Sequence, residues 1–255
     1  MELALVVVLL AGCQFSTTKR QVGLVPAPRP MSFDGQTMPT AMRVEGRAST
    51  ILGSREASAA TSGGQSAYVA RDVLGGSVFG RIGDGELGVS LDVVRSRNAS
   101  PMTAEAELAP APLDNGYTLS INARRSVSLD DGWAIGLAGD LGWTKVPILF
   151  GDRESSDIAA LYRAALVPSH RSGAVTVFGS LQLTNEIMVP ATVTGRSPDP
   201  EASAGGLAVV PTLGASVRIG EGVKLTAQLA QPFNTPIDYG PQVELAFGYE
   251  LGEVR

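Results

Sequence analysis

The sequence predicts an all-β fold: an antiparallel, up-and-down transmembrane β-barrel of about ten strands. Three observations predict it: apolar and polar residues alternate with a period of two, the connections are alternately short and long, and both charge signs occupy the face opposite the apolar one. We expect strands near residues 42–50, 68–82, 86–95, 117–128, 133–144, 158–167, 173–184, 207–219, 223–231 and 241–251.

The clearest alternation lies in residues 117–143. Leu119 and Ile121 share one face of the first half, and Asn122 lies on the other. Asp131-Gly132 supplies the residue types that tolerate the positive φ of a tight hairpin turn. The stretch therefore predicts two long antiparallel strands, each with one apolar face.

The connections between the expected strands indicate the topology. The short ones are residues 83–85, 129–132, 168–172 and 220–222, and the longer ones are 51–67, 96–116, 145–157, 185–206 and 232–240. In a meandering sheet every second connection lies at the same end, so tight turns gather at one end and long loops at the other. An even strand count also leaves both ends of the barrel on the short-turn side.

The apolar face is expected to meet lipid. Trp133 and Trp143 begin and end the apolar face of one strand, ten residues apart. In a tilted strand that spacing covers about 25 Å, the height of the apolar band between two aromatic girdles. A soluble barrel that binds an apolar ligand would show the same alternation with this face turned inward.

The opposite faces of the strands carry charges of both signs, which are costly in lipid but can pair inside a lumen. These charged residues are Arg43, Glu45, Arg47, Arg81, Asp92, Arg124, Asp140, Arg163, Arg218, Lys224, Glu244 and Glu250. We expect structural pairing there and consider Arg124 with Asp140 a candidate pair. The lumen charges predicted on this basis are Arg124, Asp140, Arg163, Arg218 and Glu244.

The N-terminus reads as an export signal. Residues 3–12 form an uncharged, mostly aliphatic run that is too short to span a membrane as a helix. The run ends in Leu10-Ala11-Gly12-Cys13, which resembles the lipobox of bacterial lipoproteins. The resemblance implies a signal peptide over 1–12 and lipidation of Cys13. We expect residues 13–41 to be a flexible tether and 42–255 the barrel, with the lipidated N-terminus on the periplasmic side.

The C-terminal strand carries a second resemblance. Residues 240–247, GPQVELAF, resemble the assembly signal of outer-membrane barrels, with eight further residues after the aromatic. With the architecture of 42–255, this resembles the small outer-membrane barrels of the OmpA/OmpX-like class. The resemblance implies the bacterial outer membrane as the location, with its lipid and the barrel-assembly and lipoprotein-sorting machinery as partners.

Catalytic and cofactor chemistry is not expected. A net charge of −5 argues against nucleic acid, and the single Cys and single His leave few arrangements for metal or nucleophilic sites. Residues 83–88 fit G-x-G-x-x-G, but a strand pattern follows where the dinucleotide motif needs a helix. His170 lies in an expected short turn, away from any loop-end site. No catalytic residue, metal site or cofactor is predicted.

The function that these patterns favour is a lipid-anchored outer-membrane barrel with a non-catalytic structural or surface-interaction role, its extracellular partner contacted through the long loops. Two alternatives stay open: a small channel or transporter for ions or apolar solutes, and a lipid-tethered lipocalin-like barrel that binds a ligand. A lipid-modifying enzyme would need His170 and is not favoured.

Overall fold

A computed structural model gives the fold of residues 21–26, 28–36, 40–52, 65–95, 100–101, 114–150, 153–185, 207–234 and 239–253. These residues are almost entirely strand, with one 3-10 turn at Asp130–Gly132. Within them, no helix is long and apolar enough to cross a membrane. The strands are β1 (Gln21–Pro26), β2 (Thr40–Ile51), β3 (Gln65–Ala70), β4 (Asp72–Ile82), β5 (Gly85–Arg95), β6 (Ser100–Pro101), β7 (Gly116–Ser128), β8 (Trp133–Phe150), β9 (Arg153–Ser172), β10 (Val175–Thr184), β11 (Ala208–Ile219), β12 (Val223–Ala230) and β13 (Gln242–Glu253).

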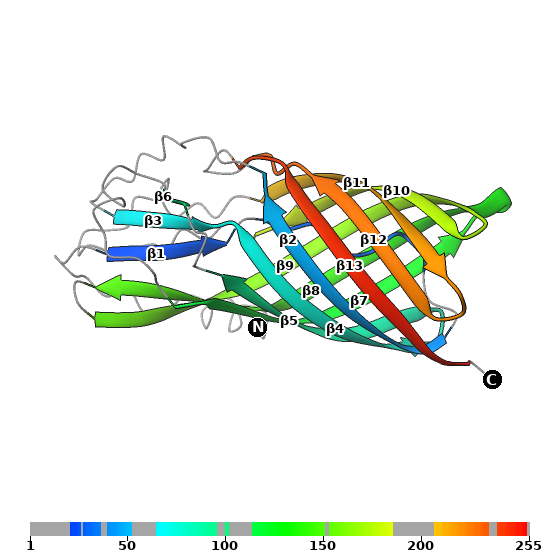
Figure 1. Ribbon diagram of the computed structural model, residues 1–255, viewed down its shortest axis with the longest axis horizontal. Coiled ribbons are helices and arrows are strands. Elements are labelled where there is room, and N and C mark those ends of the chain that lie inside the picture. The colour runs from blue at the N-terminus through cyan, green and yellow to red at the C-terminus, as the bar shows by residue number, and fades with distance from the viewer. Residues whose placement is uncertain are drawn as a thin grey trace, which may run out of the picture.

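Ten of these strands close into an antiparallel barrel (Figure 1). The order around the wall is β8-β7-β5-β4-β2-β13-β12-β11-β10-β9, and β9 pairs back onto β8. The first and last barrel strands lie side by side, with Thr40 opposite Glu253. Closure leaves no unpaired strand edge along the wall, which a sheet in lipid requires. The predicted fold class is therefore confirmed.

Two connections differ from the sequence prediction. The loop expected over 145–157 is mostly strand, because β8 continues to Phe150 and β9 begins at Arg153. This hairpin extends past the barrel wall at the long-loop end (Figure 1). The strand expected over 68–82 divides at Arg71 into β3 and β4.

The N-terminal strand β1 was not predicted. It pairs antiparallel with the end of β8, where Gln21 lies opposite Phe150. On its other side it pairs in parallel with β3, which in turn pairs with the short β6. Figure 1 shows β1 and β3 side by side beyond the barrel wall, next to the β8–β9 hairpin. This extension covers part of what was expected to be a tether.

The short turns lie where the sequence placed them or close by. Gly83 has φ +58° between β4 and β5, and Asp131 and Gly132 have φ +57° and +81° between β7 and β8. Glycine and aspartate are the types that reach this left-handed region most readily. The stretch 83–88 is thus a hairpin turn that leads into β5, not a dinucleotide-binding loop.

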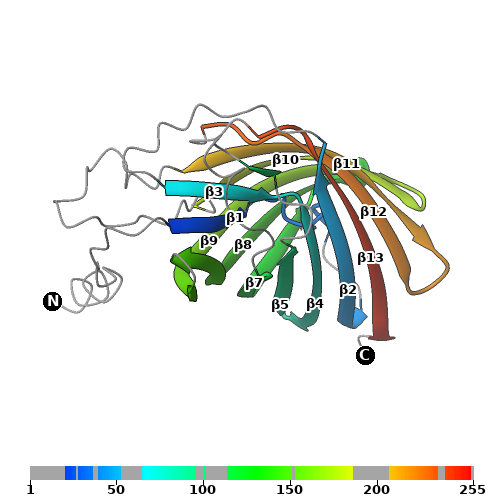
Figure 2. The same cartoon turned by 60° about the vertical axis from the view of Figure 1, so that its left-hand side comes forward.

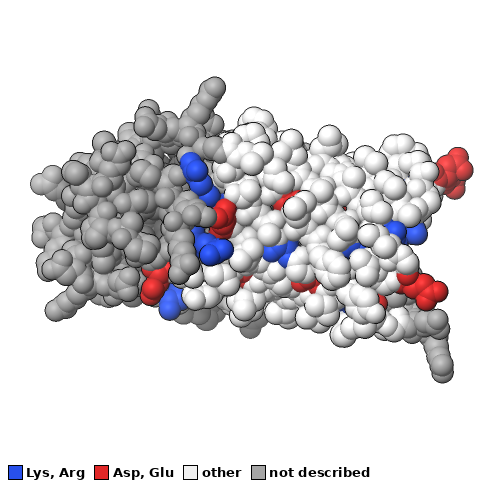
Figure 3. Space-filling model, in the orientation of Figure 1, with Lys and Arg blue, Asp and Glu red and all other residues white. Residues whose placement is uncertain are grey.

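The apolar faces of the strands point outward. Leu119, Ile121, Leu137 and Leu141 are 49, 53, 54 and 69% exposed, while alternate residues between them are buried. The lipocalin-like alternative needed the same four side chains inside, so the structure contradicts it. On the face drawn in Figure 3 the wall is mostly uncharged, and the charged side chains gather mostly toward its ends.

Candidate functional site

The interior of the barrel is polar and is the candidate functional site. Inward-facing side chains on the strands are charged, amide or hydroxyl groups that solvent barely reaches. Buried ions need partners, because an unpaired charge away from water is costly. The wall residues in question include Arg43, Glu45, Ser77, Glu86, Ser90, Asp92, Asn122, Arg124, Asp140, Arg163, Gln182, Ser216, Lys224, Gln228, Glu244 and Glu250.

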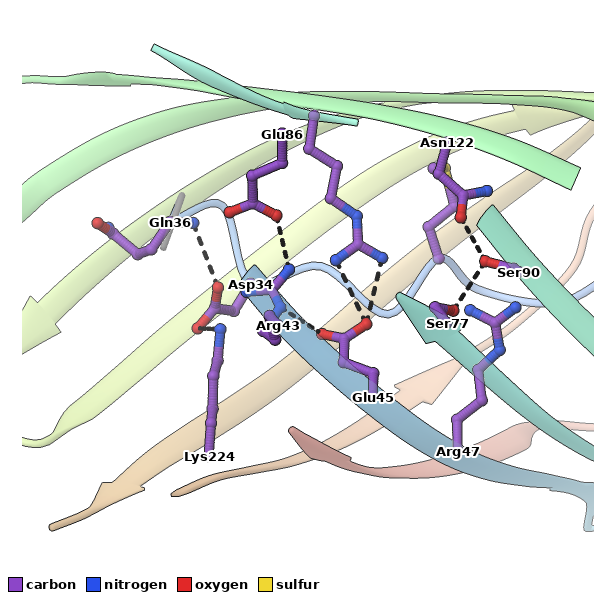
Figure 4. Close-up of polar contacts among 12 residues, drawn as sticks. Asp34, Gln36, Arg43, Glu45, Arg47, Ser77, Glu86, Ser90, Asn122 and Lys224 are labelled. Carbon is purple, nitrogen blue, oxygen red and sulfur yellow. Dashed lines mark hydrogen bonds and ion pairs between the residues drawn. The ribbon is translucent and has the colours of Figure 1, made fainter. Parts of the chain in front are cut away.

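Four charged side chains from β2, β5 and β7 form one cluster (Figure 4). Arg43 contacts Glu86 at 2.7 Å and Glu45 at 3.2 Å, and Arg124 contacts Glu45 at 3.4 Å. The Arg124 guanidinium also lies over the ring of Phe79, 3.8 Å from its centroid. A guanidinium against an aromatic face keeps a favourable partner without a second carboxylate. The cluster is therefore held by ion pairs and by cation–π contacts, which also include Arg43 over the Phe79 ring at 5.2 Å and Arg124 over the Phe33 ring at 5.4 Å.

A hydroxyl and amide network continues along the wall beside this cluster. Ser77 and Ser90 share a hydrogen bond of 2.7 Å, and the Ser90 hydroxyl donates to the side-chain oxygen of Asn122. The Asn122 amide then donates to Ser120. Figure 4 shows the first two of these contacts. Such a network satisfies polar groups that the narrow interior removes from bulk water.

Residues 28–36, which we call the lumen segment, fill the interior. Met31, Ser32, Phe33 and Asp34 are each no more than 5% exposed, although they belong to no strand. The segment follows β1 and precedes β2, and Figure 2 shows its blue trace inside the curve of the barrel strands. The flexible tether predicted for 13–41 therefore does not describe this part of the chain.

Two ion pairs tie the lumen segment to the wall at different heights. Arg29 lies 3.0 Å from Asp92, a carboxylate that Arg47 also contacts at 2.7 Å. Asp34 lies 2.7 Å from the Lys224 ammonium and accepts a hydrogen bond from neighbouring Ser216. The contact between Asp34 and Lys224 is visible in Figure 4.

Wall amides satisfy the backbone of the lumen segment. Gln182 accepts from the Met31 N–H at 2.8 Å and donates to the Arg29 carbonyl at 2.6 Å. Gln228 donates to the Met31 carbonyl at 3.3 Å and to Glu244 at 2.7 Å. Backbone groups without a regular ladder need such partners when they are buried. The wall is thus chemically matched to the segment.

Apolar packing completes the fit. Met31 and Phe33 form a buried cluster with Ala138, Ala165, Val167 and Phe178 of the wall. Close approach is possible because two glycines face each other: a Cβ on Gly136 would lie 2.6 Å from Gly35 Cα. Gly35 itself has φ +79°, a conformation that favours glycine. The lumen segment and wall therefore meet backbone to backbone at this point.

The five predicted lumen charges all lie on inward faces, but their partners differ from the expected pair. Asp140 contacts Arg163 at 2.5 Å on the adjacent strand, whereas Arg124 contacts Glu45. Arg124 and Asp140 occupy offset positions, since Arg124 lies opposite Ala138 and Asp140 lies opposite Asn122. Arg218, which is partly exposed, contacts Glu250 at 2.9 Å, and Glu244 accepts from Gln228.

The predicted girdle residues lie outside the lumen, on the outer face of the wall. Trp133 and Trp143 are on the outer face of β8, 52 and 56% exposed. The Trp133 ring lies 4.8 Å from that of His170, which belongs to β9 and not to the expected turn. This contact places the single histidine at the outer surface beside the short turns. Cys13 and the signal peptide lie outside the described residues.

Three charged residues of the interior were missed by the sequence reasoning: Arg29, Asp34 and Glu86. Glu86 follows a turn and alternates correctly with Leu87, so the strand pattern alone could have placed it inside. The lumen segment carries a weaker signal, because Met31 and Phe33 alternate with polar neighbours over only six residues.

In the described part of the chain, no group of three or more His, Cys, Asp or Glu side chains is placed to hold a metal ion. The carboxylates of the interior are engaged by arginine, lysine or amide partners. This arrangement is suited to filling and rigidifying a lumen.

A closed wall with an apolar exterior and an ionic interior is the architecture that spans outer membranes. The fold is that of an outer-membrane β-barrel.

Comparisons with solved structures find distant likenesses of fold. An outer-membrane channel from Pseudomonas putida F1 aligns with a TM-score of 0.46 and 10% identity, over 88% of this chain and 100% of that one. The β domain of the Bordetella autotransporter BrkA aligns at 0.44 and 12%, over 84 and 100%. The outer-membrane protease OmpT from Escherichia coli aligns at 0.40 and 10%, over 83 and 94%.

No family model matches the sequence, and no curated protein matches it. At these identities and scores the solved structures identify neither a family nor an activity, and they include a channel, an autotransporter domain and a protease. The apolar outer surface of the barrel itself is what indicates a membrane.

Proposed function

We propose that this protein is a lipid-anchored outer-membrane barrel with a non-catalytic structural or surface-interaction role. The lipid is attached at Cys13. The lumen segment closes the barrel to ions. The observation that carries the closure is the burial of residues 28–36 inside the wall, tied by Arg29 to Asp92 and by Asp34 to Lys224.

The chemistry of the interior supports the structural role. Ion pairs, amide contacts and the cluster around Phe33 and Phe178 leave the interior groups engaged with one another. A small barrel filled in this way is rigid and presents its long loops on one side of the membrane. Loops held on a rigid scaffold are where binding residues most often lie. An external partner would be met there.

The anchor is supported by the sequence Leu10-Ala11-Gly12-Cys13, in which the only cysteine follows two small residues after an aliphatic run. Several acyl chains on one cysteine would hold the membrane firmly, whereas a single chain binds it only marginally. Labelling of the protein with a radioactive fatty acid tests this part, with Cys13→Ser as the control that loses the label.

The closure is tested by conductance in planar lipid bilayers. The full chain is expected to pass no current over a wide voltage range, and a variant that lacks residues 28–36 is expected to conduct. If the deletion prevents folding, the double variant Arg29→Gln/Asp34→Asn removes both ion pairs and keeps the chain length. Steady current through the full chain, with the lumen segment in place, would contradict the proposed closure.

A second candidate is a small ion channel, for which the polar wall is the favouring observation. This function requires the lumen segment to move aside, because its side chains fill the interior. Brief openings of the full chain that become frequent in Arg29→Gln/Asp34→Asn would favour the channel over the structural role.

A further inference from the structure

The lumen segment has a direction. β1 pairs antiparallel with the end of β8 that is farthest from the short turns, since Gln21 lies opposite Phe150 and Gly23 opposite Ile148. β8 begins at Trp133, directly after the turn at Asp130–Gly132. β1 therefore starts at the long-loop end and runs toward the barrel, as its arrow in Figure 1 shows.

The contacts of the lumen segment follow this direction in order. Arg29 meets Asp92, three residues before β5 ends at the long-loop side. Asp34 meets Lys224, the second residue of β12 after its short turn. Gln36 donates to Ser169 at 2.9 Å, on the part of β9 that approaches the turn into β10.

The next described residue, Thr40, lies opposite Glu253 at the short-turn end. Between Pro26 and Thr40 the chain thus crosses the barrel from one end to the other. Fourteen residues extend up to about 46 Å, which exceeds the height of about 25 Å of an apolar band. The connection from Pro26 to Thr40, which contains the lumen segment, is therefore long enough to make the crossing.

We propose that the chain passes through its own lumen and presents everything N-terminal to β1 on the long-loop side of the membrane, the cell surface. Short turns of such barrels face the periplasm and long loops face outward. The sequence led us to expect the N-terminus in the periplasm, because both ends of the barrel lie at the short turns. The lumen segment instead leads from the short-turn end back to β1 at the long-loop end, so the N-terminus lies on the opposite side of the membrane.

A consequence for the anchor rests on the proposed function. From Cys13 to Gln21 the chain spans eight residues, at most about 29 Å when extended. Gln21 lies opposite Phe150, beyond the wall at the outer end, so a return outside the barrel would have to cover that height as well as the apolar band of about 25 Å. The reach is too short for both. A lipid on Cys13 therefore enters the outer leaflet, beside the loops.

Epitope accessibility on intact cells tests the crossing. One variant carries a short epitope directly before Gln21, a second carries it between Asn185 and Leu207 in a long loop, and a third carries it at Gly220-Glu221 in a short turn. Each must keep the heat-modifiable gel migration of a folded barrel. Antibody is expected to bind the first two on intact cells and the third only after permeabilisation.

The untagged chain gives an independent measurement. Arg20, directly before β1, is a trypsin site in the sequence. Trypsin added to intact cells is expected to create an N-terminus at Gln21, identified by mass spectrometry. An epitope before Gln21 that behaves like the turn epitope, together with cleavage only after permeabilisation, would overturn the crossing.

The same cells separate the crossing from the anchor. If the fatty-acid label is absent while the epitope before Gln21 is exposed, the result supports the crossing and contradicts the lipid anchor. If the label is present and trypsin removes it from intact cells, both stand. A label that trypsin removes only after permeabilisation contradicts the crossing and leaves the anchor in place.

Discussion

Asp34 and Lys224 lie 190 residues apart in the chain, and their carboxylate and ammonium groups are 2.7 Å from each other inside the barrel. Both side chains are almost fully shielded, at 2 and 6% exposure. The Ser216 hydroxyl donates to the same carboxylate. The pair joins the lumen segment to β12, and it does so near the short-turn end. A contact of this kind holds the segment in place only as long as both charges remain.

Replacing Asp34 is expected to destabilise the barrel. Asp34→Asn leaves the buried Lys224 ammonium without its carboxylate, at a cost of about 3–5 kcal/mol in the free energy of unfolding. Urea titration of the refolded protein, followed by gel migration, measures the change. The exposed pair Arg125–Asp84, at 3.6 Å, is the control, and Asp84→Asn should cost less than about 1 kcal/mol. Equal losses in the two variants would contradict the buried contact.

Gly136 is expected to be intolerant of a side chain. In Gly136→Ala the new Cβ would lie 2.6 Å from both Gly35 Cα and the Phe33 ring, so the lumen segment or the wall must shift. Overpacking of this kind costs about 1–3 kcal/mol. Gly139→Ala, on the same strand, meets its nearest atom at 3.7 Å and should change stability by less than about 0.5 kcal/mol. Thermal unfolding of the two variants in detergent makes the comparison, and a harmless Gly136→Ala would argue against the close approach.

Asp140 is expected to be coupled to Arg163 and only weakly to Arg124. Residues in direct contact show interaction free energies of about 0.5–3 kcal/mol in double-mutant cycles, whereas residues without a shared contact are nearly additive. The cycle Asp140→Asn with Arg163→Gln should therefore show coupling. The cycle Asp140→Asn with Arg124→Gln serves as the reference. A larger coupling in the second cycle would restore the pair that the sequence suggested.

Leu137 is expected to lie at the membrane midplane, since it is exposed on the outer face between Trp133 and Trp143. Leu137→Arg should cost about 2–4 kcal/mol in lipid, because an arginine at the midplane cannot reach water easily. Leu129→Arg, beside a short turn, should cost about 0–1 kcal/mol. Unfolding in phospholipid vesicles measures both. A soluble, stable Leu137→Arg protein would be incompatible with a lipid-facing surface.

The barrel could be predicted from the sequence because the strand period is local. Alternation in 117–143 determines which side chains share a face, and closure then decides that the charged face is the interior. The end of β8 could not be predicted so easily, because Pro147 reads as a strand breaker. It lies between the part of β8 that pairs with β7, which ends at Lys145, and the part that pairs with β1, which begins at Ile148.

The lumen segment was beyond the reach of sequence patterns. Pro28 and Pro30 interrupt it, so it has neither a helical nor a sustained strand period. Its order comes from contacts with residues far away in the sequence, such as Asp92, Ser169 and Gln182. Which interior charges pair with one another could not be predicted from the sequence either, because the strand register determines that Asp140 lies opposite Arg163. Sequence identifies which charges face inward, and the three-dimensional register decides which of them meet.

The most direct test of the central claim, that residues 28–36 lie inside the barrel, is a cross-link between the lumen segment and the wall. Gln36 contacts Ser169 at 2.9 Å, so Gln36→Cys/Ser169→Cys should be joined by a short thiol-to-thiol reagent in the folded protein. The matched control is Gln36→Cys/Leu166→Cys, since Leu166 lies on the same strand and faces outward. Peptide mapping that finds the link between positions 36 and 169, and none between positions 36 and 166, is the predicted result. Folded barrels in which the two thiols of Gln36→Cys/Ser169→Cys stay unlinked, or in which the control pair links just as readily, would contradict the account.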